Sequence, residues 1–181
     1  MKWMIASDIH GSAYYCRRLL DCFEREGAER LLLLGDILYH GPRNDLPRDY
    51  APKEVAAMLN AMADRVLGVR GNCDAEIDQA VLRFPIMAEY ALLCEDSLTV
   101  FATHGHLYNL DCLPPLRFGE ILLHGHTHVP ACVEKDGVVY LNPGSVAIPK
   151  EETRHSAMTL CRGVFRWIDL ENGEVYRQFE K

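Results

Sequence analysis

The first half of the chain alternates short apolar segments with helical patterns. In chain order, the predicted elements are a strand at 3–7, a helix at 12–26, a strand at 30–35, a helix at 53–64 and a strand at 65–69. Ser12 stands where an N-cap would begin the first helix. Because strands that alternate with helices pair in parallel through crossover connections, this pattern predicts an α/β fold.

The second half is rich in short β-forming segments separated by turn sequences such as Lys135-Asp136-Gly137. Strands are predicted at 86–94, 97–103, 120–124, 129–134, 138–141, 156–161, 163–169 and 174–179. The 181 residues contain no repeat or linker-like segment, so we expect one domain, residues 1–181, with two mixed sheets packed face to face.

Composition narrows the classes of protein to consider. A net charge of −7 argues against nucleic acid or an anionic membrane as the main partner, although bound metals would still admit a phosphorylated substrate. The seven cysteines are odd in number and form no C-x-x-C pair, a pattern typical of reduced thiols. Asp8 interrupts any signal-peptide core, and no apolar run reaches transmembrane length. We therefore expect a cytoplasmic protein.

Polar clusters follow the predicted strands. They are Asp8-Ile9-His10-Gly11, Gly35-Asp36, Gly71-Asn72-Cys73-Asp74, His104-Gly105-His106 and Gly125-His126-Thr127-His128. Ligands of open α/β sheets lie beyond the carboxyl ends of the strands, so these clusters should meet at one edge. The candidate metal ligands are Asp8, His10, Asp36, Asn72, His104, His126 and His128.

Each of these residues, taken singly, also has an ordinary structural explanation. Asp8, Asp36 and Asn72 suit strand-end turns, and His104 suits a hydrogen-bonded core position. His126 and His128 are harder to explain, because side chains two apart in an extended segment point to the same side. The coincidence of seven donors after predicted strands favours a metal site.

The donor types indicate which metals would bind. Carboxylate, amide and imidazole donors favour borderline divalent ions such as Mn, Fe, Zn, Co or Ni. Seven donors are too many for one tetrahedral zinc. They suit two ions that share a carboxylate, roughly 3.5–4 Å apart, an arrangement used for displacement at phosphorus.

The ordered motifs D-x-H, GD, GN-x-D, H and GH-x-H resemble the calcineurin-like metallophosphoesterase superfamily, and the resemblance runs from Asp8 to Ser145. Cys73 in GNCD, the segment HGPRNDLPRDYAP at 40–52 and NPGS at 142–145 narrow it to small bacterial phosphodiesterases. The resemblance implies an αββα sandwich of two mixed β-sheets flanked by helices. It also implies two divalent ions per chain, Mn²⁺ first, with Zn²⁺, Fe²⁺, Ni²⁺ or Co²⁺ as alternatives.

The resemblance further implies roles for individual residues. Asp8, His10 and His128 would hold one metal, and Asn72, His104 and His126 the other. Asp36 would bridge the two, and a hydroxide between them would attack phosphorus. Cys73, Asn72 and His104 form the implied catalytic set.

Cys73 stands where many relatives have a histidine that protonates the leaving group. A thiol with an ordinary pKa of about 8.5 is a poorer proton donor near neutral pH, so we expect a preference for good leaving groups. A buried small residue is the alternative at this position. Asp74 is expected to cap the next segment or to orient a ligand.

Several further residues are expected near the site. His40, Arg43 and His106 are candidate substrate contacts; Arg43 would clamp a phosphate oxygen, unless it is a solvated loop residue. His124 is expected to pack in its strand or support a ligand, and His155 to lie on the surface.

The favoured function is that of a metal-dependent phosphodiesterase acting on a small diester. A phosphomonoesterase and a non-catalytic scaffold of the same fold are the alternatives. No sequence feature indicates nucleic acid specificity or membrane attachment, and a homo-oligomer is compatible with the sequence.

Overall fold

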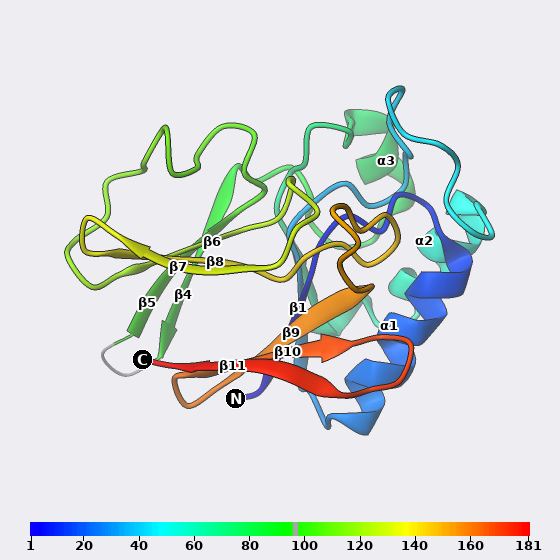
Figure 1. Ribbon diagram of the computed structural model, residues 1–181. Helices are drawn as coiled ribbons and strands as arrows, with labels where there is room; N and C mark the ends of the chain where they lie inside the picture. The colour runs from blue at the N-terminus through cyan, green and yellow to red at the C-terminus, as the bar shows by residue number, and fades with distance from the viewer. Residues whose placement is uncertain (96–97) are drawn as a thin grey trace.

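Two mixed β-sheets form the centre of the molecule in the computed structural model, which describes residues 1–95 and 98–181 (Figure 1). The six-stranded sheet has the order β11-β10-β9-β1-β2-β3. Its parallel part consists of β1 (Trp3–Ala6), β2 (Arg30–Leu33) and β3 (Val66–Gly68). Its antiparallel part consists of β9 (Ser156–Cys161), β10 (Val164–Asp169) and β11 (Val175–Glu180).

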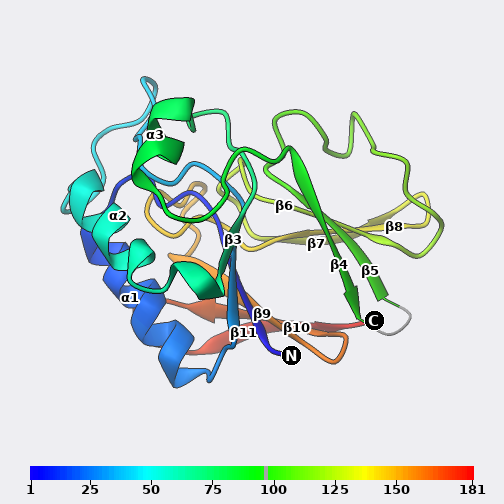
Figure 2. The same ribbon diagram turned by 180° about the vertical axis from the view of Figure 1, so that it is seen from behind.

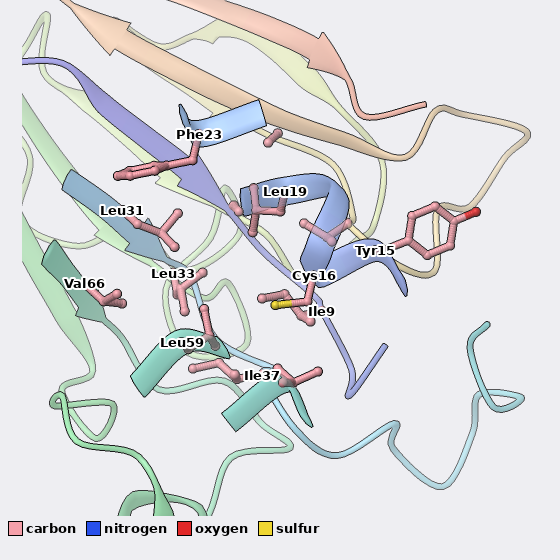
Figure 3. Close-up of a cluster of buried hydrophobic side chains, with 14 of the residues drawn as sticks. Ile9, Tyr15, Cys16, Leu19, Phe23, Leu31, Leu33, Ile37, Leu59 and Val66 are labelled. Atoms are coloured by element: carbon pink, nitrogen blue, oxygen red, sulfur yellow. The ribbon is translucent and has the colours of Figure 1, made fainter. Parts of the chain in front are cut away.

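Helices cover one face of this sheet. They are α1 (Ala13–Arg25), α2 (Pro52–Asn60), a 3₁₀ turn (Ala63–Arg65) and α3 (Glu76–Val81). The Ser12 hydroxyl caps α1 by accepting a hydrogen bond from the Tyr15 amide at 3.3 Å. Leu19 and Phe23 of α1 pack with Leu31 of β2 and Leu59 of α2 (Figure 3). This buried cluster fixes the helices against the strands whose ends carry the polar residues.

The second sheet has five strands in the order β4-β5-β6-β8-β7. They are β4 (Tyr90–Glu95), β5 (Leu98–Thr103), β6 (Ile121–His124), β7 (Ala131–Lys135) and β8 (Val138–Asn142). Apolar side chains from both sheets, such as Ile5 and Leu123, form the core between them. The fully buried Trp167 also links the sheets, because its indole N–H donates to the Asn142 carbonyl at 2.6 Å.

The outer face of the five-stranded sheet is covered differently. Phe101, Leu122 and Tyr140 of this face pack against Tyr108 and Leu116 from the segment between β5 and β6. Figure 2 shows that segment running over the sheet, on the side of the molecule away from α1 and α2. The predicted two mixed sheets with flanking helices are confirmed, and the described helices lie against the six-stranded sheet.

Element boundaries differ from the predictions in a few places. The predicted helix at 53–64 ends at Asn60, and the predicted strand at 86–94 begins only at Tyr90. The predicted strand at 97–103 is described from Leu98 onward, and residue 97 lies outside the described residues. The short helix α3 was not predicted, because none of its side chains is buried and it lacks an apolar face. Within 1–95 and 98–181, no helix combines the length and apolar character needed to cross a membrane.

Candidate metal centre

The seven predicted donors gather at the carboxyl edge of the parallel strands. Asp8 and His10 follow β1, Asp36 follows β2, Asn72 follows β3, His104 follows β5, and His126 and His128 follow β6. Both sheets therefore contribute to one site, as expected for ligands beyond strand ends.

One group of donors surrounds Asp8. Its Oδ1 lies 3.6 Å from His10 Nε2 and 3.3 Å from His128 Nε2. The two Nε2 atoms are 3.4 Å apart. Donors that each lie roughly 2.0–2.2 Å from one ion are roughly 2.8–3.6 Å apart in tetrahedral or octahedral geometry. The spacing in this group therefore suits a shared cation.

A second group surrounds His104. Its Nε2 lies 3.0 Å from Asn72 Oδ1 and 3.1 Å from His126 Nδ1. Asp36 stands between the two groups, because its Oδ2 is 3.6 Å from His104 Nε2 and 3.7 Å from His10 Nε2. One carboxylate oxygen is thus within reach of both groups.

Backbone carbonyls set the orientation of three imidazoles. The Nδ1 atoms of His10, His104 and His128 lie 2.8, 2.6 and 2.6 Å from the carbonyl oxygens of Tyr39, Leu34 and Ile148. A carbonyl only accepts, so each Nδ1 carries the proton. In the neutral ring, Nε2 then presents a lone pair to the donor group.

The buried polar atoms of the site fit a cation. Asp8 is fully buried, and its Oδ1 has no hydrogen-bond partner among the described residues. Burial opposes its charge, yet contacts with His10 and His128 hold the pKa of this carboxyl well below its usual range. Burial also lowers the pKa of His126 to about 4, so that this ring is neutral and able to bind metal. A buried carboxylate oxygen without a hydrogen-bond partner is unfavourable unless it is paired or coordinated, so this donor set fits divalent metal ions.

The backbone is strained at most of the proposed ligands. Positive φ angles occur at Asp8 (60°), His10 (48°), Asp36 (55°), His126 (65°) and His128 (63°). Such conformations cost roughly 1–3 kcal/mol each outside glycine and cluster at functional sites. Here they occur in the segments that follow β1, β2 and β6.

The turn after β6 also determines which donor group each of its two histidines joins. His126 and His128 lie in a turn after β6, not in an extended segment, so the extended-chain argument for placing them at one site does not apply, although both side chains line the same cavity. His126 joins His104, whereas His128 joins Asp8 and His10.

Asp74 ties two of the ligand-bearing loops together. Its Oδ2 accepts hydrogen bonds from the amides of Asp36 at 2.8 Å and Gly71 at 2.7 Å, and its Oδ1 accepts from Ile37 at 2.9 Å. The side chain is 2% exposed, and burial raises its pKa. Asp74 thus orients Asp36 and does not cap α3, where Asp78 accepts from the Ala75 amide. Gly71 is required for this approach, since a Cβ there would collide with the Asp36 carboxylate.

Cys73 reaches the same site from the loop after β3. Its amide donates to Asp36 Oδ1 at 2.8 Å. Its sulfur, a donor atom of His10 and one of Asp36 all lie within 4.8 Å of one another, so the thiol lies beside the candidate metal ligands. Burial, together with the Asp36 charge, raises the pKa of the thiol to about 12. The thiol is therefore protonated at neutral pH and a weak acid.

A cavity of about 450 Å³ opens beside the donors. Its walls include Asp36, Asn72, Cys73, His126 and His128, together with Gly41, Pro42, Arg43, Asn44, Thr127 and Lys150. Arg43 thus lies where a substrate contact was predicted. Lys150 was missed, because nothing in the sequence indicates that the segment after NPGS returns to the cavity. A larger cavity of about 800 Å³ between α2 and α3 contains none of the seven donors.

The other predicted contacts lie outside the cavity wall. The His40 ring packs edge-on against Tyr39 and Tyr50, with centroids 4.7 and 5.2 Å away. His106 lies beside the ligands, with its ring 5.4 Å from His104 and 6.3 Å from His126. Their roles as substrate contacts stay predictions.

Two histidines outside the donor set pack against tyrosines. His124 is buried and stacks on Tyr140 at 4.4 Å, in line with its expected packing role. The surface position expected for His155 was wrong: it is partly buried and stacks on Tyr15 at 3.7 Å.

Comparison with known proteins identifies the family and supports the fold. The family model described as the calcineurin-like phosphoesterase superfamily domain matches residues 1–162. Phosphodiesterase YfcE of Escherichia coli K12 is 44% identical over 178 residues, which cover 98% of this chain and 97% of that protein. The solved structure of YfcE, described as a phosphoesterase from E. coli, superposes with a TM-score of 0.96 at 43% identity and covers 99% of each chain.

Two further proteins are similar to this chain at lower sequence identity. Phosphodiesterase MJ0936 of Methanocaldococcus jannaschii is 26% identical over 151 residues, covering 80% of this chain and 83% of that protein. Vps29 of Entamoeba histolytica, solved in complex with zinc, has a TM-score of 0.63 at 18% identity, covers 99% of each chain and shows the fold alone. By the family model and by the full-length match to YfcE, the chain belongs to the calcineurin-like phosphoesterase superfamily.

Proposed function

We propose that this protein is a phosphodiesterase that works with two divalent metal ions. The observation that carries the proposal is the position of Asp36 Oδ2, which is 3.7 Å from His10 Nε2 in one donor group and 3.6 Å from His104 Nε2 in the other. A single carboxylate in this place is suited to bridge two ions. The 44% identity to phosphodiesterase YfcE supports a diester as the substrate.

The chain's own residues divide the work of binding. Asp8, His10 and His128 would hold one ion, and Asn72, His104 and His126 the other. Two ions held in this way would supply Lewis acidity: they would lower the pKa of bound water toward neutrality and offset charge at phosphorus. Imidazole and oxygen donors suit Mn²⁺, which we propose first, with Zn²⁺, Fe²⁺, Ni²⁺ or Co²⁺ as alternatives.

Cys73 bears on the kind of ester that is cleaved. Its thiol lines the cavity, and burial raises its pKa, so that it is a weaker proton donor than an imidazole. A leaving group that is stable as an anion needs little protonation, whereas an alkoxide needs much. We therefore propose that the protein cleaves esters with activated or otherwise stable leaving groups in preference to alkyl monoesters. A phosphomonoesterase activity is the alternative.

The cell compartment and the partners belong to the same proposal. All seven cysteines are free, which supports a cytoplasmic location. A small phosphodiester is the proposed partner, and a homo-oligomeric state stays a prediction.

Hydrolysis of bis(p-nitrophenyl) phosphate and p-nitrophenyl phosphate tests the proposal. Protein stripped of metal with a chelator is assayed with and without added Mn²⁺. We expect release of nitrophenol from the diester only with metal, and faster than from the monoester. Diester hydrolysis that survives chelation, or a faster monoester reaction, would contradict the proposal. A scaffold without activity would hydrolyse neither ester under any metal.

A further inference from the structure

Two cationic side chains line the cavity beyond the proposed metal ligands. Arg43 comes from the loop after β2, and Lys150 from the segment between β8 and β9. Both side chains are exposed, and neither forms an ion pair within the described parts of the chain, 1–95 and 98–181. Among the residues that the structure describes, Asp36 is the one carboxylate in the cavity wall, and it is assigned to the metals. The two cations are therefore available to a ligand.

Hydrogen bonds order the backbone of both segments that carry these cations. The Arg43 loop is closed by Asn44, whose side-chain amide donates to the His40 carbonyl at 2.8 Å. The Lys150 amide donates to the carbonyl of His128 at 3.3 Å, and the Lys150 carbonyl accepts from the Thr153 hydroxyl at 2.6 Å. The Arg43 loop is thus closed by its own hydrogen bond, and the Lys150 backbone is tied to that of the candidate ligand His128.

With a simple diester bound, the charges at the proposed metal centre would already balance. Two divalent ions carry four positive charges. The carboxylates of Asp8 and Asp36, a hydroxide nucleophile and a diester monoanion together carry four negative charges. Arg43 and Lys150 then add two positive charges that nothing in the cavity wall offsets. A cavity of about 450 Å³ is within the range of roughly 300–1,000 Å³ typical of small-ligand sites, so it has room for a group beyond the reacting phosphoryl.

We propose that Arg43 and Lys150 form a second anion subsite, and that the substrate class is a phosphodiester whose alcohol carries a further phosphate group. This proposal rests on the proposed phosphodiesterase function. The guanidinium of Arg43 suits bidentate binding of phosphate oxygens, and the ammonium of Lys150 acts as a point charge.

Matched substrates with the same leaving group test the subsite. One is the p-nitrophenyl ester of a nucleoside 5′-phosphate with a free 3′-hydroxyl, and the other carries a 3′-phosphate. The Mn²⁺-loaded protein is expected to favour the phosphorylated ester in kcat/KM, mainly through KM. Hydrogen bonds to charged groups are worth about 1.5–3 kcal/mol, so Arg43→Gln and Lys150→Gln should each reduce this preference about 10- to 100-fold. Lys135→Gln on β7, outside the cavity, is the control and should keep the preference.

Calorimetric binding to the Mn²⁺-loaded protein gives a readout independent of turnover. A nucleoside 3′,5′-bisphosphate should bind more tightly than the 5′-monophosphate, and the difference should shrink in both cavity variants. If the variants lose kcat/KM equally for both substrates, the subsite proposal is wrong, because the cations would then bind the reacting phosphate. Equal kcat/KM for both substrates in the unmodified protein would also overturn it. If bis(p-nitrophenyl) phosphate is not hydrolysed at all, the proposed function itself fails.

Discussion

Replacing Asp74 by asparagine removes a charge but little volume at the link between two ligand loops. The carboxylate accepts three backbone N–H groups, from Asp36, Gly71 and Ile37. An asparagine oxygen placed at Oδ2 would keep the first two bonds, but its NH₂ group would then face the Ile37 amide. A buried N–H would lose its acceptor, and two charge-assisted bonds would become neutral ones.

The expected loss of stability follows from these bonds. An unsatisfied buried donor costs about 1–3 kcal/mol, and the loss of charge weakens two further bonds. Asparagine also avoids burying a charge, which offsets part of the loss, so we expect a net destabilisation of about 2–3 kcal/mol. For a chain of this size the melting temperature should fall by roughly 4–12 °C. Because Asp36 is displaced, metal affinity should fall about 10- to 100-fold.

Thermal unfolding of the metal-free protein and Mn²⁺ titration against a chelator measure both effects. Asp78→Asn is the matched control, since Asp78 accepts one amide in α3, away from the donors. It should cost less than about 1 kcal/mol and leave metal affinity unchanged. An Asp74→Asn protein with normal melting and normal metal affinity would refute the role of Asp74 as a positioning residue.

Three further predictions address the bridge, the leaving group and pH. Asp36→Asn should weaken the binding of both ions by more than about 100-fold in calorimetric titration, whereas His128→Asn should weaken the binding of mainly one ion. Near-normal turnover of the Asp36→Asn protein at modest metal concentrations would exclude a bridging role for Asp36. Cys73→His should raise kcat/KM for an alkyl monoester relative to kcat/KM for an aryl diester. The upper limit is the roughly 10²–10⁴-fold that general acid catalysis typically gives. If the ratio of the two kcat/KM values is unchanged across pH 6–9, other residues set the substrate selectivity. Burial lowers the pKa of His124 to about 4. At this position the unfolded chain therefore binds a proton between about pH 6.5 and pH 4 that the folded chain does not, so His124 alone should contribute about 3 kcal/mol to the stability that the metal-free protein loses over that range as pH falls. Urea unfolding at several pH values measures this loss, and His124→Gln should make it smaller; an equal loss in the variant would assign it to other groups.

The sequence indicated the candidate donors because each lies only a few residues beyond the end of a strand. Asp8, Asp36 and Asn72 come after strands that pair in parallel, so strand order alone brings them to one edge. The division of His126 and His128 between two groups followed from the family resemblance. It did not follow from spacing, since it depends on left-handed backbone that a pattern of residue types does not reveal.

Other features depend on how distant segments meet. Lys150 enters the cavity because its amide binds the His128 carbonyl, a contact between residues that no local signal connects. No local signal indicates either that the segment between β5 and β6 covers the outer face of the five-stranded sheet. His155 has a polar neighbourhood in sequence, yet the fold places it against Tyr15. Such contacts are set by tertiary packing and not by propensity.

Metal stoichiometry at saturation tests the central claim most directly. Protein freed of metal is titrated with Mn²⁺, bound metal is counted by elemental analysis, and the electron paramagnetic resonance spectrum is recorded at each step together with turnover of bis(p-nitrophenyl) phosphate. The account predicts two ions per chain, a spectrum of spin-coupled manganese at saturation, and full activity only when both ions are bound. Full activity at one ion per chain, with an uncoupled manganese spectrum, would contradict it.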